Sequence, residues 1–528
     1  MASTKRFTTI LLASTACAAL AGCGADDIAS PGEGNLINII TPAPTPTPSP
    51  TPTPTPTPTP PGGPFAGPTP AGFTDRGVVN GRRVFEMPTR FTQDTTIQNL
   101  PGAVYSIAGP VNVGTDIGGD GAATLAGGNR VTLTVQPGVI VIASQGLDYL
   151  QVNRGSRLNA IGTATQPIIF TARANLEGTA TDSTQGLWGG IILLGRAPIS
   201  DCNTAVAGGS AGCQNVIEGT TSGLYGGNVA NDSSGSLQFI QIRYSGFAIS
   251  QGNELQGLTT GGAGNATQMN NVQVHNSSDD GVEFFGGQQN ARYLAITGAD
   301  DDALDTDLGY TGFMQFVVAV QRDANNGDSA VEADSNGNED ALPRQNTRLA
   351  NFTFVQRSMV QGGNVMLIRG GADYTMVNGV VSGTGSCLDI DETGGTTTRA
   401  ANPALQDAGP PVFRSVVFSC TNAFRADGNE ATVATIFGTG TNNNNSAFVS
   451  SLASVFVNGA NERAVTPFAA ATLNPAGSGA PNQFQTTTYI GAVRDAADTA
   501  FAGWTCNAGY VNFGTTSGSC TALPAIGS

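Results

Sequence analysis

Carboxylates are the residues of this chain whose spacing most clearly predicts chemistry. When short segments from the middle of the chain are aligned, their acidic residues fall into two columns two residues apart. The first column contains Glu283, Asp305, Glu332 and Asp389, and the second contains Asp307, Asp334 and Asp391, with Phe285 in the preceding copy. Residues i and i+2 of a strand face the same side, and neighbouring strands lie about 4.8 Å apart. We therefore expect both columns to crowd together on one surface.

Three interpretations of this acidic surface remain open. The first is one or more Ca²⁺ ions, which take about six to eight oxygens at roughly 2.4 Å. The second is a solvated acidic face, paired with arginines such as Arg292, Arg322 and Arg369. The third is a catalytic pair, Asp280 and Asp302, because carboxyls with different pKa values can divide acid and base roles. The candidate metal ligands are Asp279, Asp280, Glu283, Asp301, Asp302, Asp305, Asp307, Glu332 and Asp334.

The composition excludes several classes of site and partner. Without residues 1–22 the chain has 21 basic and 39 acidic residues, a net charge of −18. Such a body is not expected to bind nucleic acid, whereas cations and basic partners suit it. The only lysine of the chain is Lys5, which lies within residues 1–22, and the only histidine is His275. A P-loop lysine, a Schiff-base lysine and a multi-histidine metal centre are therefore excluded. We expect His275 to be an exposed or hydrogen-bonded polar residue rather than a base.

Six cysteines follow Cys17 and Cys23, and an even number in an exported protein favours disulfides. Sequential pairing is the simplest of the fifteen connectivities, because each pair closes a local loop. No C-x-x-C spacing supports metal binding by these thiols. The pairs would be Cys202 with Cys213, Cys387 with Cys420, and Cys506 with Cys520.

The elements that must position the carboxylates belong to a repeat. Segments of ten residues beginning at Leu237, Met269, Ala291, Met314, Leu349, Tyr374 and Pro411 align with offsets of 32, 22, 23, 35, 25 and 37 residues. Their fourth and sixth positions are mostly apolar, with Gly379 and Arg414 as exceptions. The short offsets are one rung of about 22–25 residues, and the long ones contain an inserted loop. Apolar alternation of period two within such a rung is typical of a β-solenoid.

A second strand repeats in step with the first. Asn253–Gly262, Ser278–Gly287 and Asp300–Gly309 align at offsets of 25 and 22 residues. Two strand columns with one common period argue against a sandwich. The repeat therefore predicts an all-β fold, a parallel β-helix with inserted loops. We expect its ends to be capped by Arg83–Ala108 and by the cysteine-bearing segment from Gln483.

Several motifs resemble a poorly characterised family of bacterial surface lipoproteins, some of which are labelled "multidrug transporter". They include Leu187–Pro198 (LWGGIILLGRAP), Asp279–Gly287 (DDGVEFFGG) and Thr486–Val493 (TTTYIGAV). The resemblance covers about residues 85–520 and implies a pectin-lyase-like right-handed parallel β-helix. It implies little about activity, since a fold alone does not determine function.

The first residues resemble a lipoprotein signal. Lys5 and Arg6 precede an apolar stretch that is too short to span a bilayer and ends at Leu20-Ala21-Gly22-Cys23, which resembles a lipobox. The resemblance implies cleavage before Cys23 and a diacylglycerol on its thiol; the alternative is an ordinary secretory signal. Gly24 follows the cysteine in place of the Asp that resembles an inner-membrane retention signal, which favours the outer membrane.

A Thr-Pro alternation from Thr41 to Pro60 predicts an extended polyproline-II spacer of about 60 Å. The predicted organisation is a signal peptide (1–22), a lipid-anchored linker (23–72) and a β-helix domain (73–528). We expect a non-catalytic binding, adhesion or accessory module that binds a cation, with a polysaccharide or an outer-membrane protein as partner. The alternative is a Ca²⁺-dependent polysaccharide lyase or hydrolase.

Overall fold

The computed structural model describes residues 62–250, 252–322, 327–335, 338–358, 363–391, 395–475 and 483–527. The chain divides into two units, residues 1–58 and 59–528, and all described residues belong to the second. The signal sequence, Cys23 and the Thr-Pro spacer therefore lie outside the described residues.

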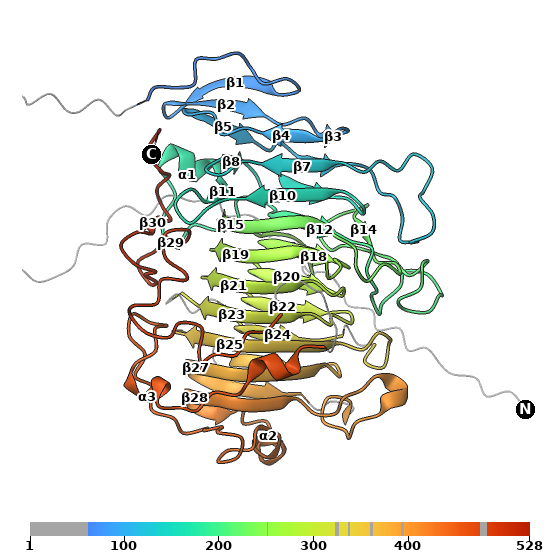
Figure 1. Ribbon diagram of the computed structural model, residues 1–528, viewed down its shortest axis with the longest axis vertical. Coiled ribbons are helices and arrows are strands. Elements are labelled where there is room, and N and C mark those ends of the chain that lie inside the picture. The colour runs from blue at the N-terminus through green and yellow to red at the C-terminus, as the bar shows by residue number, and fades with distance from the viewer. Residues whose placement is uncertain are drawn as a thin grey trace, which may run out of the picture. The chain divides into compact units, whose positions relative to one another are not determined.

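Short parallel strands stack in three columns, and each rung adds one strand to each column (Figure 1). Column 1 begins with β2 (Arg82–Glu86), β5 (Ala103–Ser106), β8 (Ile140–Ala143) and β11 (Ile168–Ala172). Column 2 contains β3 (Arg90–Phe91), β6 (Pro110–Val113), β9 (Tyr149–Val152), β12 (Ile191–Leu194), β18 (Leu258–Gly261), β20 (Val282–Phe285), β22 (Leu304–Asp307), β24 (Val331–Ala333) and β26 (Asn364–Ile368). Column 3 begins with β4 (Thr95–Ile97), β7 (Thr132–Val135) and β10 (Arg157–Ile161). The predicted parallel β-helix is confirmed.

From β15 onward, one long strand in each rung bends and belongs first to column 3 and then to column 1. At the bend one residue has a left-handed backbone, with φ of 51° at Phe239, 56° at Asn271 and 57° at Tyr293. Among residues other than glycine, asparagine is one of those that adopt this left-handed backbone most readily. The bend turns the strand without ending it. The long strands are β15 (Gly235–Arg243), β19 (Gln268–His275), β21 (Asn290–Thr297), β23 (Phe313–Val320), β25 (Asn346–Gln356), β27 (Asp373–Ile390) and β28 (Val412–Phe424).

Inward-facing side chains of the three columns form a continuous apolar core. Ile240 and Ile242 of β15 stack on Val272 and Val274 of β19, and all four are buried. The predicted offsets of 32, 22, 23 and 35 residues are confirmed by the pairing of β15, β19, β21, β23 and β25. The period-two alternation therefore located the core correctly over these rungs.

The predicted register is wrong at one step, between the copies that begin at Leu349 and Tyr374. Leu349 pairs with Met376 rather than with Tyr374. The predicted offset of 37 residues to the last copy is confirmed, because Met376 pairs with Phe413. A shift of two residues leaves every side chain on its own face, so the alternation cannot detect it. The true offset at this step is 27 residues instead of 25.

In the corrected register Arg414 is no longer an exception, whereas Gly379 keeps its inward position. Gly379 pairs with Phe352, whose ring carbon lies 2.0 Å from the place where a Cβ would stand. The ring thus fills the space that a second side chain would need. In column 2 the first predicted offset is also wrong, because Leu258 pairs with Val282 rather than with Glu283.

The ends of the solenoid are closed differently from the prediction. Strand β1 (Thr74–Val79) pairs antiparallel with β2 at the first end, so Arg83–Ala108 forms rungs rather than the cap. At the other end Val433 and Phe437 of α2 (Glu430–Phe437) join the core. The other short elements are α1 (Arg173–Glu177), α3 (Ala460–Arg463), the 3-10 turns Pro403–Leu405 and Ala470–Leu473, β13 (Asn215–Val216), β14 (Leu224–Tyr225), β16 (Phe247–Ser250), β17 (Asn253–Leu255), β29 (Cys506–Asn507) and β30 (Gly518–Ser519).

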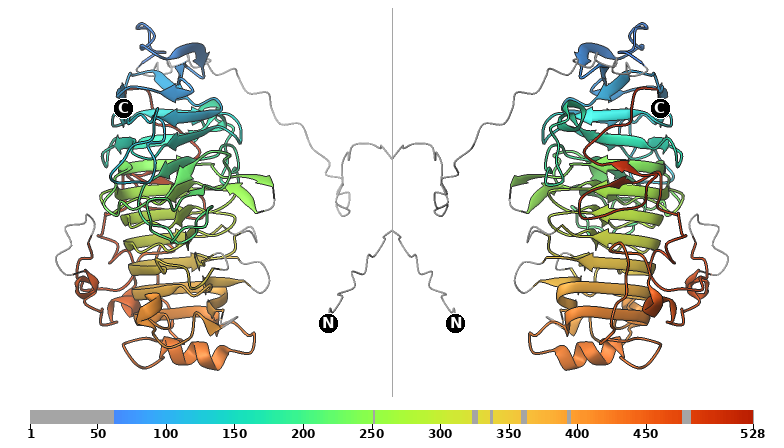
Figure 2. Two further views of the ribbon diagram at one scale, coloured as in Figure 1. Left: turned by 90° about the vertical axis from the view of Figure 1, so that its right-hand side faces the viewer. Right: turned by 90° about the vertical axis from the view of Figure 1, so that its left-hand side faces the viewer.

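Residues 483–527, which we call the strap, are not a cap: they run back along the outside of the rungs toward the first end (Figures 1 and 2). Gln273 of β19 donates from Nε2 to the Cys506 carbonyl at 3.0 Å, and its Oε1 accepts the Cys506 N–H at 2.6 Å. Gln315 of β23 holds Gln485 in the same two-point manner, at 2.7 and 2.8 Å. We call these two contacts the amide clamps. Trp504 packs beside them in an apolar cluster.

The three predicted disulfides are present with sequential pairing, Cys202–Cys213, Cys387–Cys420 and Cys506–Cys520. The first lies in the insertion after β12, the second joins β27 to β28, and the third closes a loop of the strap. None of the helices in the described part of the chain is long and apolar enough to cross a membrane.

Candidate functional site: a covered acidic cluster

The outward face of column 2, where the carboxylates lie, is covered by residues 195–234. We call this insertion between β12 and β15 the cover; it is the group of loops around β14 in Figure 1. Its Ile199 and Tyr225 pack with Ile192 and Phe285 of column 2, and the rings of Tyr225 and Phe285 lie 6.2 Å apart. Asp279, Asp280 and Glu283 are buried, so the interpretation as a solvated surface is wrong for these three carboxyls. Asp301 is exposed, and Asp305 is partly buried.

The first carboxylate column has the predicted order with one addition. Glu283 pairs with Asp305, and Asp305 pairs with Glu332. Leu367 of β26 then stands between Glu332 and Asp389. The rung of β26 was absent from the alignment of the second strand, so the predicted column is interrupted there.

Arginine also divides the carboxylates into two groups. Arg369, which follows β26, contacts Glu332 and lies 3.1 Å from Asp334. Asp389 lies beyond it, 3.1 Å from Arg425. These ion pairs neutralise the carboxyls at one end of the column and leave the group between β18 and β24 without this compensation.

Two trios of carboxylates meet in that remaining group. Asp279, Asp280 and Asp301 form the first trio, and Asp280, Glu283 and Asp305 form the second. Within each trio, one oxygen from every residue lies within 4.8 Å of the others. Oxygens that bind one Ca²⁺ at roughly 2.4 Å can be at most about 4.8 Å apart, so both trios have the dimensions of a cation site. We call these five residues the acidic cluster, and Asp280 belongs to both trios.

The proposed catalytic carboxyls Asp280 and Asp302 are buried, with 7 % and 4 % of their surfaces exposed. Asp280 Oδ1 accepts the backbone N–H of Asp302 at 2.9 Å, and Asp302 Oδ1 accepts that of Ser329 at 2.6 Å. Each carboxyl thus joins its own turn to the turn of the next rung. This burial argues against contact with a polysaccharide chain, and we do not propose catalysis by this pair.

Some carboxylate oxygens of the group have no hydrogen-bond partner among the described residues. They are Glu283 Oε2 and Asp307 Oδ1, and each residue is only 5 % exposed. A buried acceptor without a donor is unfavourable, and a buried negative charge without a partner is more so. A cation or a proton would remove both penalties.

Burial and mutual repulsion disfavour the ionised forms throughout the cluster. Desolvation, together with the charges of Asp301 and Glu254, raises the pKa of Asp279 to about 8. Desolvation followed by the charge of Asp334 raises the pKa of Asp307 to about 8. The pKa values of Asp280 and Glu283 lie well above their ordinary range for the same reasons. Without a bound cation, the folded protein would hold several of these carboxyls protonated at neutral pH.

Two further carboxylates were missed by the sequence reasoning. Glu218 of the cover accepts the backbone N–H of Glu254 of β17 at 2.8 Å. Their charges help to raise the pKa of Asp279, and burial raises the pKa of Glu218 itself to about 7. Both residues lie in insertions, so an alignment of the rungs could not place them. The only signal in the sequence was that they are acidic.

The remaining candidate residues lie away from the cluster. Arg322 pairs with Asp300, and Arg292 donates to the carbonyl of Gln483. His275 is fully buried under the strap with Nδ1 2.9 Å from Thr297 Oγ1, and burial lowers its pKa to about 3. His275 is therefore a neutral packing residue, as the expectation of a hydrogen-bonded polar residue implied.

Comparison with known proteins agrees with the fold. A family model described as "Pectate-lyase like beta helix domain" matches residues 120–457, more than half of the chain. No curated protein and no solved structure matches the chain. The matched residues include the cover, the acidic cluster and most of the three columns. The chain belongs to the pectate-lyase-like β-helix family.

Proposed function

We propose that this protein is a non-catalytic, cation-binding β-helix of the bacterial cell envelope, in which the acidic cluster binds Ca²⁺. The observation that carries the proposal is the sharing of Asp280 by two carboxylate trios, each with oxygens within 4.8 Å of one another. Oxygen-only ligands of negative charge are what Ca²⁺ prefers. A carboxylate that bridges two ions would allow the cluster to take two Ca²⁺ ions side by side.

The surroundings of the cluster support a cation more than a set of protons. Glu283 Oε2 has no donor among the described residues, and the guanidinium of Arg369, whose charge acts on Asp307, is already paired with Glu332 and Asp334. A bound cation satisfies several acceptors at once, whereas each proton satisfies one carboxyl. The cover adds Glu218, whose negative charge acts on Asp279 and Glu283 and strengthens the attraction for a cation.

The test is the stoichiometry of Ca²⁺ binding, measured by titration calorimetry on purified, chelator-treated protein. Two ions are expected for the wild-type chain. Glu283→Gln should remove one ion, Asp279→Asn the other, and Asp280→Asn both, because only Asp280 belongs to both trios. Glu177→Gln, at an exposed ion pair with Arg173, is the matched control and should bind two ions. Absence of binding to the wild-type protein, or unchanged binding by Asp280→Asn, would contradict the proposal.

We also propose that the protein is anchored to the outer membrane through a lipid on Cys23 and presents its β-helix to a polysaccharide or to an outer-membrane protein. The lipobox-like Leu20–Cys23 and the Thr-Pro spacer support the anchor. Incorporation of labelled fatty acid by the wild-type chain, lost in Cys23→Ala, would test it; equal labelling of both would rule out this position. The net charge of −18 makes nucleic acid an unsuitable partner.

A further inference from the structure

Two arginines near the first rungs are buried without a carboxylate partner among the described residues. Arg82 of β2 is 9 % exposed, and Arg243 of β15 is 2 % exposed. Arg82 donates to the carbonyl of Pro524 in the strap. Arg243 donates to Gln241 Oε1 at 2.8 Å and to the Cys520 carbonyl at 2.8 Å. All of these acceptors are neutral, so neither positive charge is balanced in a chain that is otherwise strongly acidic.

Each of these guanidinium groups lines a cavity beneath the end of the strap. The cavity beside Arg82 has a volume of about 220 Å³, and the one beside Arg243 about 340 Å³. Thr165, Pro167 and Pro524 line both, so the two cavities adjoin. Sites for drug-sized ligands have volumes of roughly 300–1,000 Å³, so both cavities are at or below the lower end of this range. An occupant would have to be a small molecule or an ion.

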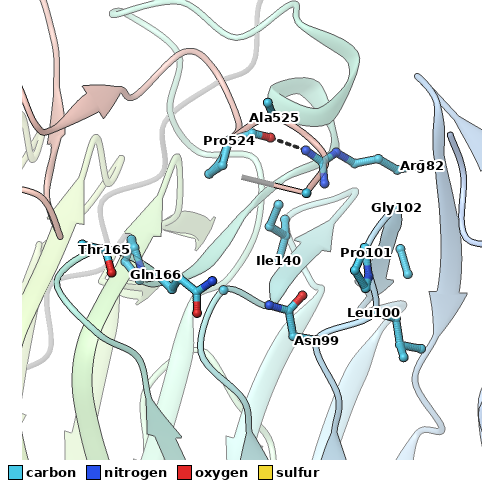
Figure 3. Close-up of a pocket in the computed structure, with 14 residues that line it drawn as sticks. Arg82, Asn99, Leu100, Pro101, Gly102, Ile140, Thr165, Gln166, Pro524 and Ala525 are labelled. Carbon is cyan, nitrogen blue, oxygen red and sulfur yellow. Dashed lines mark hydrogen bonds between the residues drawn. The ribbon is translucent and has the colours of Figure 1, made fainter. Parts of the chain in front are cut away.

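Polar side chains line two sides of the first cavity, and one of them, Asn99, already donates from Nδ2 to the Pro137 carbonyl at 2.9 Å. Figure 3 shows the guanidinium of Arg82 at one side of the cavity and the amides of Asn99 and Gln166 at the opposite side. The floor between them includes the apolar Ile140. Guanidinium groups bind carboxylate and phosphate oxygens through parallel hydrogen bonds, and the side-chain amide of Gln166 can add an N–H donor.

We propose that this cavity binds a small oxyanion, a carboxylate or an inorganic phosphate, with Arg82 as the principal charge partner and Arg243 adding to the positive potential. Burial lowers the pKa of both arginines, that of Arg243 to about 10, and a bound anion would reverse this effect. The site is separate from the acidic cluster and does not depend on the proposed Ca²⁺ binding. Pro524, to which Arg82 donates, closes the site from the strap side.

The experiment is a titration of the full chain with inorganic phosphate and, in a second arm, with acetate, each against chloride at matched ionic strength and without added Ca²⁺. Calorimetry should detect saturable binding in at least one arm, and the stronger arm identifies phosphate or carboxylate as the ligand chemistry. The bound anion should also raise the melting temperature by a few degrees. Arg82→Gln should lose both effects, whereas Arg130→Gln, at an exposed arginine, should keep them.

Circular dichroism of Arg82→Gln, and the variant Arg82→Lys, separate loss of the site from loss of the fold, because the lysine keeps the charge and should retain weakened binding. Equal thermal shifts in wild type, Arg82→Gln and Arg130→Gln would show a general salt effect and overturn the proposal. Absence of saturable binding of both anions to the wild-type chain would also overturn the proposal.

Discussion

The cover and the strap both lie outside the repeat, and both pack on an outward face of the solenoid. The strap packs on amide side chains, whereas the cover packs on carboxylates. Beneath the strap, Gln273 and Gln315 each bind one peptide group through a donor and an acceptor. Beneath the cover, Glu283 Oε2 and Asp307 Oδ1 find no donor among the described residues.

The difference follows from what each side chain can offer. An amide has both a donor and an acceptor, so it can pair with backbone unaided. A carboxylate has acceptors only, and several of them together repel one another. The amide clamps are therefore complete with protein atoms alone, whereas the carboxylates beneath the cover need protons or a cation. Changes of pH and single substitutions should affect these two kinds of face differently.

The largest effect is expected from pH in the presence of a chelator. The folded pKa values of Asp279 and Asp307 are about 8, against 3.8 for the ordinary carboxyl. The folded state thus holds protons that the unfolded state has lost, so their contribution to stability is complete below pH 3.8 and is lost as the pH rises through about 8. In EDTA the melting temperature should fall between pH 5 and pH 9, and Ca²⁺ should restore it at pH 9. A melting temperature that does not depend on pH in EDTA would contradict the conclusion that these carboxyls are buried without compensating partners.

An intermediate effect is expected at the amide clamp. Gln273→Ala leaves the N–H and carbonyl of Cys506 without their partners and should lower the free energy of unfolding by about 2 kcal/mol, equally with and without Ca²⁺. Thermal melting in both buffers would measure it, with Gln268→Ala at an exposed position of the same strand as the control. A loss that appeared only in Ca²⁺ would mean that the two faces are coupled.

The smallest effect is expected from the charge that the cover contributes. Glu218→Gln removes a carboxylate that acts on Asp279 and Glu283 from a distance, so Ca²⁺ affinity should fall by about three- to tenfold while the number of ions stays at two. Calorimetry beside Glu177→Gln would measure it. Unchanged affinity would show that the cover shields the acidic cluster without contributing to its charge.

The rungs could be predicted from the sequence because alternation within a fixed repeat directly reflects the geometry of the strands. Ile240 and Val272 occupy equivalent inward positions in both the alignment and the structure. The slip at Met376 shows the limit: a period-two pattern is unchanged by a shift of two residues, so only the backbone pairing reveals it. Because the loops inserted between rungs vary in length, the spacing between copies does not exclude such a shift.

The acidic site could be predicted only in part, for a related reason. Glu283, Asp305 and Glu332 lie on rungs, and their column is confirmed. Glu218 lies on the cover, which has no second copy in the chain, so nothing in the repeat indicates where it folds. The burial that turns a solvated surface into an unbalanced cluster comes from that same insertion.

The path of the strap has a consequence for the order in which the protein can be completed. Ile526, almost at the end of the chain, lies against Gly62, and Pro524 receives the hydrogen bond of Arg82 in the first rung. Rungs synthesised early can stack as they emerge, since each contacts mainly its neighbours. The outer surface of these early rungs nevertheless stays uncovered until the strap has been synthesised. In a chain delivered from its N-terminus, the rungs that emerge first are therefore the last to be covered. A stalled or shortened chain would leave their outer surface exposed to proteases and chaperones.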